Sequence, residues 1–238
     1  MKKDTKETPE DDMQYPIRLN RYLSLCNYAT RRGADVLISG GKVFINGTKA
    51  SLGDQVQEGD HVEVEGAEEK EYVYYAYYKP KGIVTIGAQN EEKEIADVSN
   101  FPEDVFPIGR LDKDSEGLII MTNDGRITEE LLSPDFYHEK EYQVTVDQTV
   151  SHQAFVKLRH GVRIDVGRKK YMTKPAKVRR ISKNTFDIII TEGKKRQIRK
   201  MCGGVGYKVV KLKRFRIMDV ELGNLKPGQF RKIENPVK

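Results

Sequence analysis

The stretch GRLDKDSEGLIIMTNDG, residues 109–125, places three carboxylates directly before an apolar run. Asp112, Asp114 and Glu116 occupy alternate positions, and four apolar residues follow the next glycine. A short apolar run bounded by turn residues is typical of a buried strand. The stretch therefore predicts a strand over 117–121 with a cluster of acids at its start.

The chain around this acidic cluster is basic, and its cations are concentrated in two segments. Its 238 residues include 42 Lys and Arg against 36 Asp and Glu, a net charge of +6. Residues 17–50 contain one acid, Asp35, and residues 191–217 contain one acid, Glu192, among ten cations. Such segments are typical of surfaces that bind nucleic-acid phosphates. For residues 17–50 a solvated helix face is the alternative reading.

Local patterns predict a small N-terminal module. Apolar residues at helical spacing indicate one helix, and Thr30 is a suitable N-cap for a second helix that ends at Gly40. Val36 and Leu37 are expected on the apolar face of that second helix. Asn46-Gly47 lies between alternating residues and predicts a tight hairpin turn. Two helices and a small sheet therefore occupy residues 17–66.

The remaining chain predicts a larger α+β domain with a mixed, largely antiparallel sheet. Strands are expected at 73–78, 117–121, 140–146, 176–181, 185–191 and 207–212. Helices are expected at 126–132, 151–159 and 194–202. The polar residues 1–16 are expected to form a flexible tail, residues 67–72 a linker, and residues 73–238 the second domain.

Several classes of protein are disfavoured by what the sequence lacks. Cys26 and Cys202 have no CxxC spacing, so we expect a reducing compartment and a cytoplasmic location. The four histidines are scattered, and no long apolar run predicts a membrane span. The start of the chain has no apolar signal-peptide core. We expect no metal, no cofactor and a monomer.

The residues alone leave three roles open for the acidic cluster: structural ion pairs, metal ligands or a nucleophile. The spacing D-x-D-x-E is similar to part of a calcium loop, but the glycine and the distal glutamate of that loop are missing. A structural role is the commonest one for an acid in a turn.

A family resemblance favours the nucleophile. GRLDKDSEGL resembles the signature of the RsuA/RluB/RluE/RluF family of ribosomal RNA pseudouridine synthases, and the chain is most similar to the RluF branch. Residues 18–47 resemble the RNA-binding module that the family shares with ribosomal protein S-four. Further matches follow in the family's order: KPKG at 79–82, HEKEYQVTV at 138–146, EGKKRQIRKMC at 192–202 and LKPGQFRKI at 225–233.

The resemblance implies an enzyme that isomerises a uridine of large-subunit (23S) ribosomal RNA to pseudouridine without a cofactor. It implies that Asp112 is the nucleophile, that Arg199 is its partner and that Tyr142 is the active-site tyrosine. The target uridine must leave its stack to be reached. Asp114 and Glu116 are expected to form structural ion pairs.

The remaining expected contacts are with RNA. We predict substrate contacts for Arg110, Lys79, Ile198, Lys195 and Arg196. We predict phosphate contacts in the N-terminal module for Arg18, Arg21, Arg31, Arg32 and Lys42. The alternatives are the same chemistry on small-subunit ribosomal RNA or transfer RNA, and a non-catalytic RNA-binding factor of ribosome assembly.

Overall fold

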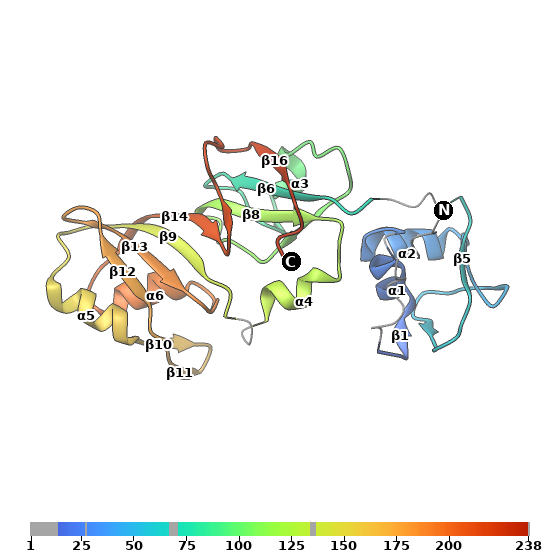
Figure 1. The fold of residues 1–238 in the computed structure, drawn as a ribbon, viewed down its shortest axis with the longest axis horizontal. Coiled ribbons are helices and arrows are strands. Elements are labelled where there is room, and N and C mark those ends of the chain that lie inside the picture. Colours follow the sequence, from blue (N-terminus) through green and yellow to red (C-terminus); the bar gives the residue numbers. More distant parts are fainter. Residues whose placement is uncertain (1–13, 27, 67–70, 134–136, 238) are drawn as a thin grey trace, which may run out of the picture. The chain divides into compact units, whose positions relative to one another are not determined.

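The computed structural model describes residues 14–26, 28–66, 71–133 and 137–237, which divide into two compact units (Figure 1). The N-terminal unit contains the described part of Met1–Val73 together with Phe101–Phe106 and Thr122–Thr128. The C-terminal unit contains the remaining described residues. The predicted tail (1–16) and linker (67–72) lie largely outside the described residues, and the sequence did not indicate the two later segments of the N-terminal unit.

The N-terminal unit has the predicted two helices and short strands. Its elements are β1 (Ile17–Arg18), α1 (Leu19–Leu25), α2 (Arg31–Ser39), β2 (Val43–Ile45), β3 (Thr48–Lys49), β4 (Gln55–Val56) and β5 (Val62–Val64). The strands form the pair β1-β4 and the sheet β3-β2-β5. Asn46 and Gly47, both at positive φ, form the two-residue turn between β2 and β3, as predicted.

Helix α2 begins as predicted but buries a different face. The Thr30 hydroxyl accepts a hydrogen bond from the Gly33 amide at 3.2 Å and caps the helix. Ala34 and Ile38, four residues apart, are buried in the core. Val36 lies half a turn from them and is 72% exposed, so the expected apolar face was wrong at this position.

The C-terminal unit is an α+β domain, as predicted, built on a nine-stranded sheet. Its elements are β6 (Tyr74–Lys79), α3 (Ile95–Val98), β7 (Phe106–Ile108), β8 (Glu116–Thr122), α4 (Ile127–Leu132), β9 (Lys140–Val146), α5 (His152–His160), β10 (Arg163–Val166), β11 (Lys169–Met172), β12 (Lys177–Arg180), β13 (Thr185–Ile190), α6 (Gln197–Gly204), β14 (Val209–Ile217), β15 (Val220–Glu221) and β16 (Phe230–Ile233). The main path runs β12-β13-β9-β14-β8-β6-β16 (Figure 1).

Strand β14 is central in this sheet and is longer than the sequence predicted. It pairs antiparallel with β9 and parallel with β8, so the sheet is mixed. The expected strand stopped at 212, before a segment with three cations, Lys213, Arg214 and Arg216. In the structure Arg214 and Ile217 are buried, and Arg216 pairs with Glu139 and Glu141. Tertiary partners therefore keep these cations within a strand.

Gly117, the glycine of the motif EGL, permits the pairing of β8 with β14. Its φ is +116°, which disfavours any residue with a side chain. A Cβ atom at this position would lie 2.1 Å from the carbonyl oxygen of Arg214. The glycine is therefore required by the close approach of the two backbones.

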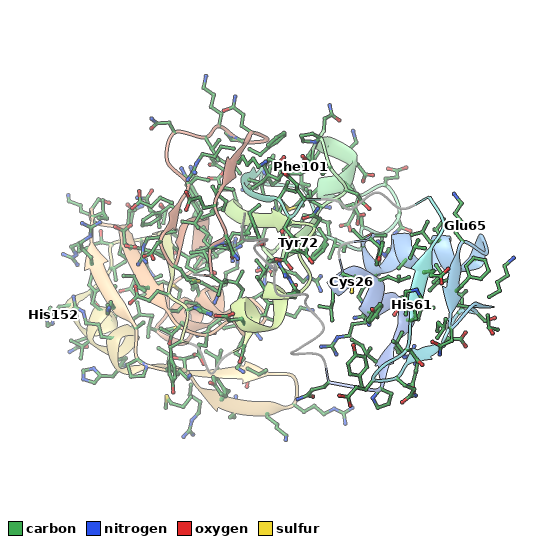
Figure 2. All side chains as sticks on the ribbon, turned by 45° about the vertical axis from the view of Figure 1, so that its right-hand side comes forward. Cys26, His61, Glu65, Tyr72, Phe101 and His152 are labelled. Carbon is green, nitrogen blue, oxygen red and sulfur yellow. The ribbon has the colours of Figure 1, made fainter. Side chains whose placement is uncertain are left out.

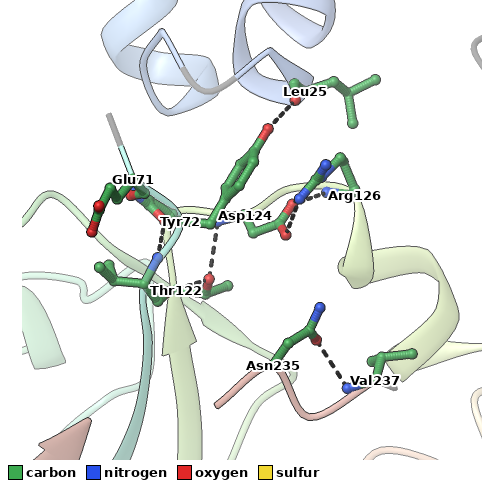
Figure 3. A network of polar contacts seen from close by, with 10 residues as sticks. Leu25, Glu71, Tyr72, Thr122, Asp124, Arg126, Asn235 and Val237 are labelled. Carbon is green, nitrogen blue, oxygen red and sulfur yellow. Dashed lines mark hydrogen bonds and ion pairs between the residues drawn. The ribbon is translucent and has the colours of Figure 1, made fainter. Parts of the chain in front are cut away.

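Polar contacts tie residues 122–128 to α1 within the N-terminal unit (Figure 3). The Tyr72 hydroxyl donates to the carbonyl oxygen of Leu25 at 2.6 Å. The guanidinium of Arg126 lies 3.8 Å from the centroid of the Tyr72 ring and pairs with the buried Asp124 at 2.9 Å. The N-terminal unit therefore includes chain from beyond the predicted linker.

The cysteines and histidines are as dispersed as the sequence indicated. Cys26 and His61 lie in the N-terminal unit and His152 in the C-terminal unit (Figure 2). Cys26 and Cys202 are free, and Cys202 is buried. Among the helices of the described residues, none has the length and apolar character that crossing a membrane requires.

Candidate active site

The loop that carries Asp112 is held by backbone hydrogen bonds on both sides. The Thr85 hydroxyl donates to the carbonyl oxygen of Leu111 at 2.7 Å and accepts from its amide at 3.0 Å. The amide of Gly82, in the turn KPKG, donates to the carbonyl oxygen of Lys113 at 2.7 Å. Ser115 closes the loop through its amide, which donates to the Asp112 carbonyl oxygen at 3.0 Å. The backbone on either side of Asp112 is therefore fixed.

The Asp112 carboxylate itself is open. Its side chain is 30% exposed, and its nearest cation is Arg196, with Nη1 3.9 Å from Oδ2. Within the described residues this carboxylate accepts no hydrogen bond, so both of its oxygens can meet a substrate. A carboxylate fixed by its loop but without hydrogen-bond partners is suited to nucleophilic attack.

Asp114 is the carboxylate that the two arginines of the motif RQIR bind. Arg196 donates through Nη1 and Nη2 to its two oxygens at 3.1 and 3.0 Å. Arg199 lies beside it, with Nε 3.3 Å from Oδ2. Burial would raise the pKa of Asp114, but the hydrogen bonds from Arg196 and the charge of Arg199 hold it below its ordinary value.

The expectation that Arg199 pairs with Asp112 was therefore wrong in this structure. The guanidinium of Arg199 also donates to the Asp114 carbonyl oxygen at 2.9 Å and to the Val209 carbonyl oxygen at 3.2 Å. Its Nη2 contacts the Ser115 hydroxyl at 3.1 Å. These contacts hold the end of the Asp112 loop against β14, whereas Arg196 is the guanidinium that lies near Asp112.

Arg196 adopts a backbone conformation that is uncommon for a residue with a side chain. Its φ is +56° and its ψ is +32°, in the left-handed region, at the N-cap of α6. The preceding turn is closed by Gln197, whose side-chain oxygen accepts from the Lys194 amide at 2.9 Å. The predicted helix over 194–202 therefore begins only at 197. Strain of this kind concentrates at functional sites.

Lys79 shapes the site from inside the protein. Its side chain is fully buried, and Nζ donates to the carbonyl oxygens of Pro80 and Ile83 at 2.8 and 2.6 Å. Burial, with a smaller contribution from Arg214, lowers its pKa to about 8, against the attraction of the three acids of the cluster. The prediction that Lys79 contacts substrate does not agree with its complete burial. It holds the turn that supports the Asp112 loop.

Tyr142 lies in β9 opposite Arg214 of β14, and its side chain is 8% exposed overall. The Arg214 Nη1 lies 3.5 Å from the Tyr142 hydroxyl oxygen. Lys79 interacts electrostatically with both Asp112 and Arg214. Lys79 therefore interacts electrostatically with the predicted nucleophile and with the arginine that contacts the predicted tyrosine.

The third acid of the cluster has a structural partner, as expected. Glu116 pairs with Lys211 of β14, its Oε1 3.1 Å from Nζ. Burial, together with the charge and hydrogen bonding of Glu116, raises the pKa of Tyr78 to about 12. Glu116 therefore connects β8 to its neighbours and is not available as a second nucleophile.

The other predicted substrate contacts differ in their accessibility. Arg110 and Lys195 are exposed, and neither has an ion pair or hydrogen bond with another described side chain. Ile198 is 3% exposed in α6, which makes it part of the core. Arg110 and Lys195 are therefore open to a ligand, and Arg196, whose side chain is 42% exposed, is already engaged with Asp114.

The predicted phosphate contacts of the N-terminal unit are all on its surface. Each of these five side chains is exposed: Arg18, Arg21, Arg31, Arg32 and Lys42. Arg31 and Arg32 form the first turn of α2, which contains no acid. All five cations are therefore open to solvent, and their contact with phosphates stays a prediction.

The sequence analysis did not single out two cations of this region, Arg214 and its electrostatic neighbour Lys140. Arg214 is 3% exposed and contacts Tyr142, and the burial of Lys140, with repulsion from Arg214, lowers the lysine's pKa to about 8. The sequence signal that could have identified Arg214 is a cation at an inward-facing position of an alternating strand. Among the described residues no group of His, Cys, Asp or Glu side chains could hold a metal ion.

Two family models match separate parts of the chain. Residues 73–203 match the model of the RNA pseudouridylate synthase family, and residues 17–62 match that of the S4 domain. The chain is 42% identical over 222 residues to the dual-specificity RNA pseudouridine synthase RluF of Escherichia coli strain K12, covering 91% of this chain and 75% of that protein.

A second curated protein and a solved structure that resemble this chain are also pseudouridine synthases. The chain is 34% identical to ribosomal large subunit pseudouridine synthase B of Bacillus subtilis strain 168, covering 91% of each protein. A crystal structure of a pseudouridylate synthase superposes with a TM-score of 0.66 at 28% identity, covering 91% of this chain and 96% of that one. The chain therefore belongs to the RNA pseudouridine synthase family, as an S4-domain enzyme similar to RluF.

Proposed function

We propose that this enzyme isomerises a uridine of large-subunit ribosomal RNA and that Asp112 is its nucleophile. The observation that carries this proposal is the carboxylate of Asp112, which is fixed by its loop, lies 3.9 Å from Arg196 and is free of hydrogen bonds from the described residues. The nearby guanidinium favours the ionised carboxylate that attack requires.

The proposed reaction begins with attack by the Asp112 carboxylate. An oxygen of Asp112 bonds to carbon one of the ribose while the bond from that carbon to N1 of uracil breaks, and the bonding pair leaves with the base. The base turns, carbon five bonds to the ribose, and the Asp112 oxygen leaves. Carbon five then loses its proton and N1 gains one, so the product is an isomer of the substrate.

Tyr142 has the proton-transfer role in this scheme. Its hydroxyl passes its proton to water, the phenolate oxygen that remains accepts the proton of carbon five, and its ring stacks on the uracil. The target nucleotide is extruded from its stack, because the ribose carbon is otherwise shielded, and Arg110 contacts the RNA beside it. The S4 domain holds the RNA by its phosphates.

The choice of large-subunit ribosomal RNA rests on the relatives. The Bacillus subtilis relative is named for the large ribosomal subunit, and the Escherichia coli relative is named as dual-specificity. We infer that the enzyme works in the cytoplasm, where ribosomal RNA is found, and that it is a monomer. The dual-specificity name favours assaying a second RNA beside the first, and small-subunit ribosomal RNA and transfer RNA are the alternatives given by the sequence analysis.

Tritium release from RNA labelled at carbon five of uridine tests this function, because the new bond displaces the label. We expect release from large-subunit RNA by the unaltered enzyme and none by Asp112→Ala. Asp165→Ala is the matched control, because Asp165 is an exposed acid of β10 whose carboxylate pairs, among the described residues, with Lys170 alone at 2.7 Å. Release by Asp112→Ala near the unaltered rate would remove Asp112 from the role of nucleophile. Release only from small-subunit or transfer RNA would replace large-subunit RNA as the proposed substrate.

A further inference from the structure

Arg214 is a cation in the interior of the sheet. It lies in β14 between β9 and β8 (Figure 1), and its side chain is 3% exposed. Its Nε donates to the Leu118 carbonyl oxygen of β8 at 2.7 Å, and its Nη1 lies 3.5 Å from the Tyr142 hydroxyl of β9. The Arg214 side chain therefore contacts both strands that neighbour β14.

This guanidinium has no counterion among the described residues. None of their carboxylates forms an ion pair with it, and its buried Nη2 has no hydrogen-bond partner there. Its electrostatic neighbours include two further cations, Lys79 and Lys140, and its charge contributes to the lowered pKa of each. Burying an unpaired charge costs free energy, and arginine cannot avoid that cost by losing its proton.

A purely structural role explains this arrangement poorly. An apolar side chain in this position of β14 would avoid the unpaired buried charge. The neighbouring Arg216 shows how this strand accommodates an arginine for stability, since it pairs with Glu139 and Glu141 at 3.0 and 2.7 Å. An uncompensated cation beside a reactive group is typical of a functional site.

The geometry fixes how Tyr142 uses its hydroxyl. A guanidinium only donates hydrogen bonds, so the Tyr142 oxygen accepts from Arg214 and its own hydrogen points elsewhere. The guanidinium carbon also lies 5.9 Å from the centroid of the Tyr142 ring. A buried cation at this distance stabilises negative charge that develops on the hydroxyl oxygen during proton transfer.

We propose that Arg214 is the positioning residue of Tyr142, which orients its hydroxyl and stabilises its charge while carbon five loses its proton. This inference rests on the proposed function. Arg214 touches no reacting atom and acts through Tyr142, so its removal lowers the rate of the chemical step and leaves RNA binding unchanged.

A double-mutant cycle tests this proposal under single-turnover conditions with saturating labelled RNA. The proteins are the unaltered enzyme, Arg214→Met, Tyr142→Phe and the double variant. We expect each single variant to lose on the order of 10²-fold in the rate of tritium release. The double variant is expected to be no slower than Tyr142→Phe, because Arg214 has no other route to the chemistry. Half-saturating RNA concentrations stay unchanged.

Arg216→Met is the matched control, since it removes a guanidinium from the same strand and is expected to affect stability alone. Losses that multiply in the double variant, or a loss of RNA affinity in Arg214→Met, would overturn the proposal. If Arg214→Met does not fold, the same cycle with Arg214→Lys decides, because a lysine keeps the charge but not the two-strand span. No release by the unaltered enzyme refutes the proposed function itself, whereas release with multiplying losses refutes only this inference.

Discussion

Arg196 binds Asp114 through two parallel hydrogen bonds, Nη1 to Oδ1 at 3.1 Å and Nη2 to Oδ2 at 3.0 Å. The same guanidinium lies 3.9 Å from the Asp112 carboxylate. Bidentate pairing of this kind fixes orientation as well as charge. Asp114 therefore holds Arg196 close to Asp112 but beyond hydrogen-bond distance of the Asp112 oxygens.

Asp114→Asn tests whether Asp114 holds Arg196 away from the Asp112 oxygens. The variant keeps one acceptor for Arg196 but loses the second oxygen and the charge, which allows the guanidinium to turn toward Asp112. We therefore expect the single-turnover rate to fall about tenfold, or about 1.4 kcal/mol of barrier, with RNA affinity unchanged. Tritium release by the variant and by an Asp165→Asn control measures the effect. A rate equal to that of the control would show that Asp114 does not hold Arg196 away from Asp112.

Asp112→Ala is expected to leave the free energy of unfolding within about 0.5 kcal/mol of the unaltered protein. The reason is that no hydrogen bond to the Asp112 carboxylate exists among the described residues, so none is lost. Urea unfolding measures the difference. Asp114→Asn loses one of the two hydrogen bonds from Arg196 and the negative charge between Arg196 and Arg199, so it is expected to be less stable than Asp112→Ala. The opposite ranking would contradict the structure.

Gly117→Ala is expected to destabilise the protein by about 3 kcal/mol or more, because its φ is +116° and its Cβ would meet the Arg214 carbonyl oxygen at 2.1 Å. Gly203→Ala in α6 is the control, since no atom lies within 4 Å of its Cβ and alanine favours a helix. Thermal unfolding measures both. Equal melting temperatures for the two variants would exclude the close approach of β8 and β14.

Stability is expected to rise with pH between about 8 and 10. Burial lowers the pKa of Lys79 and of Lys140 to about 8 in the folded protein, whereas an unfolded lysine keeps its proton to about 10.4. The unfolded state therefore binds more protons in this interval, and each lysine adds at most about 1.4 kcal/mol per pH unit. Raised tyrosine pKa values act in the opposite direction only above this interval.

Urea unfolding at pH 7, 8, 9 and 9.5 checks this dependence. Lys140→Met is expected to show a smaller slope than the unaltered protein, and replacement of an exposed lysine, Lys195→Met, is expected to leave the slope unchanged. A flat profile for the unaltered protein would mean that both lysines keep ordinary pKa values when folded.

Arg31→Ala combined with Arg32→Ala is expected to weaken RNA binding and to flatten its dependence on salt. Each lost phosphate contact lowers the slope of log K against log salt by roughly 0.7 to 0.9. Binding isotherms at several salt concentrations measure the slope, and tritium release at saturating RNA is expected to survive. An unchanged slope would remove α2 from the RNA-binding surface.

The sequence predicted the parts of the fold that local patterns control. The strands near 117–121 and 140–146, the N-cap Thr30 and the Asn46-Gly47 turn are all present, because alternation, capping and turn chemistry act over a few residues. Its errors came where distant partners decide. Val36 faces solvent, and the expected strand at 207–212 continues to Ile217 because β8 and β9 hold its cations.

The sequence by itself determined the family, the two-part organisation and Asp112 as the candidate nucleophile, since these depend on ordered motifs that can be read along the chain. Only the tertiary structure decided which guanidinium meets which carboxylate. Arg196 and Arg199 lie more than eighty residues from Asp114 along the chain, and both bind it. The buried position of Arg214 beside Tyr142 was decided in the same way. Such pairings arise from the order of strands in a sheet, which no local pattern encodes.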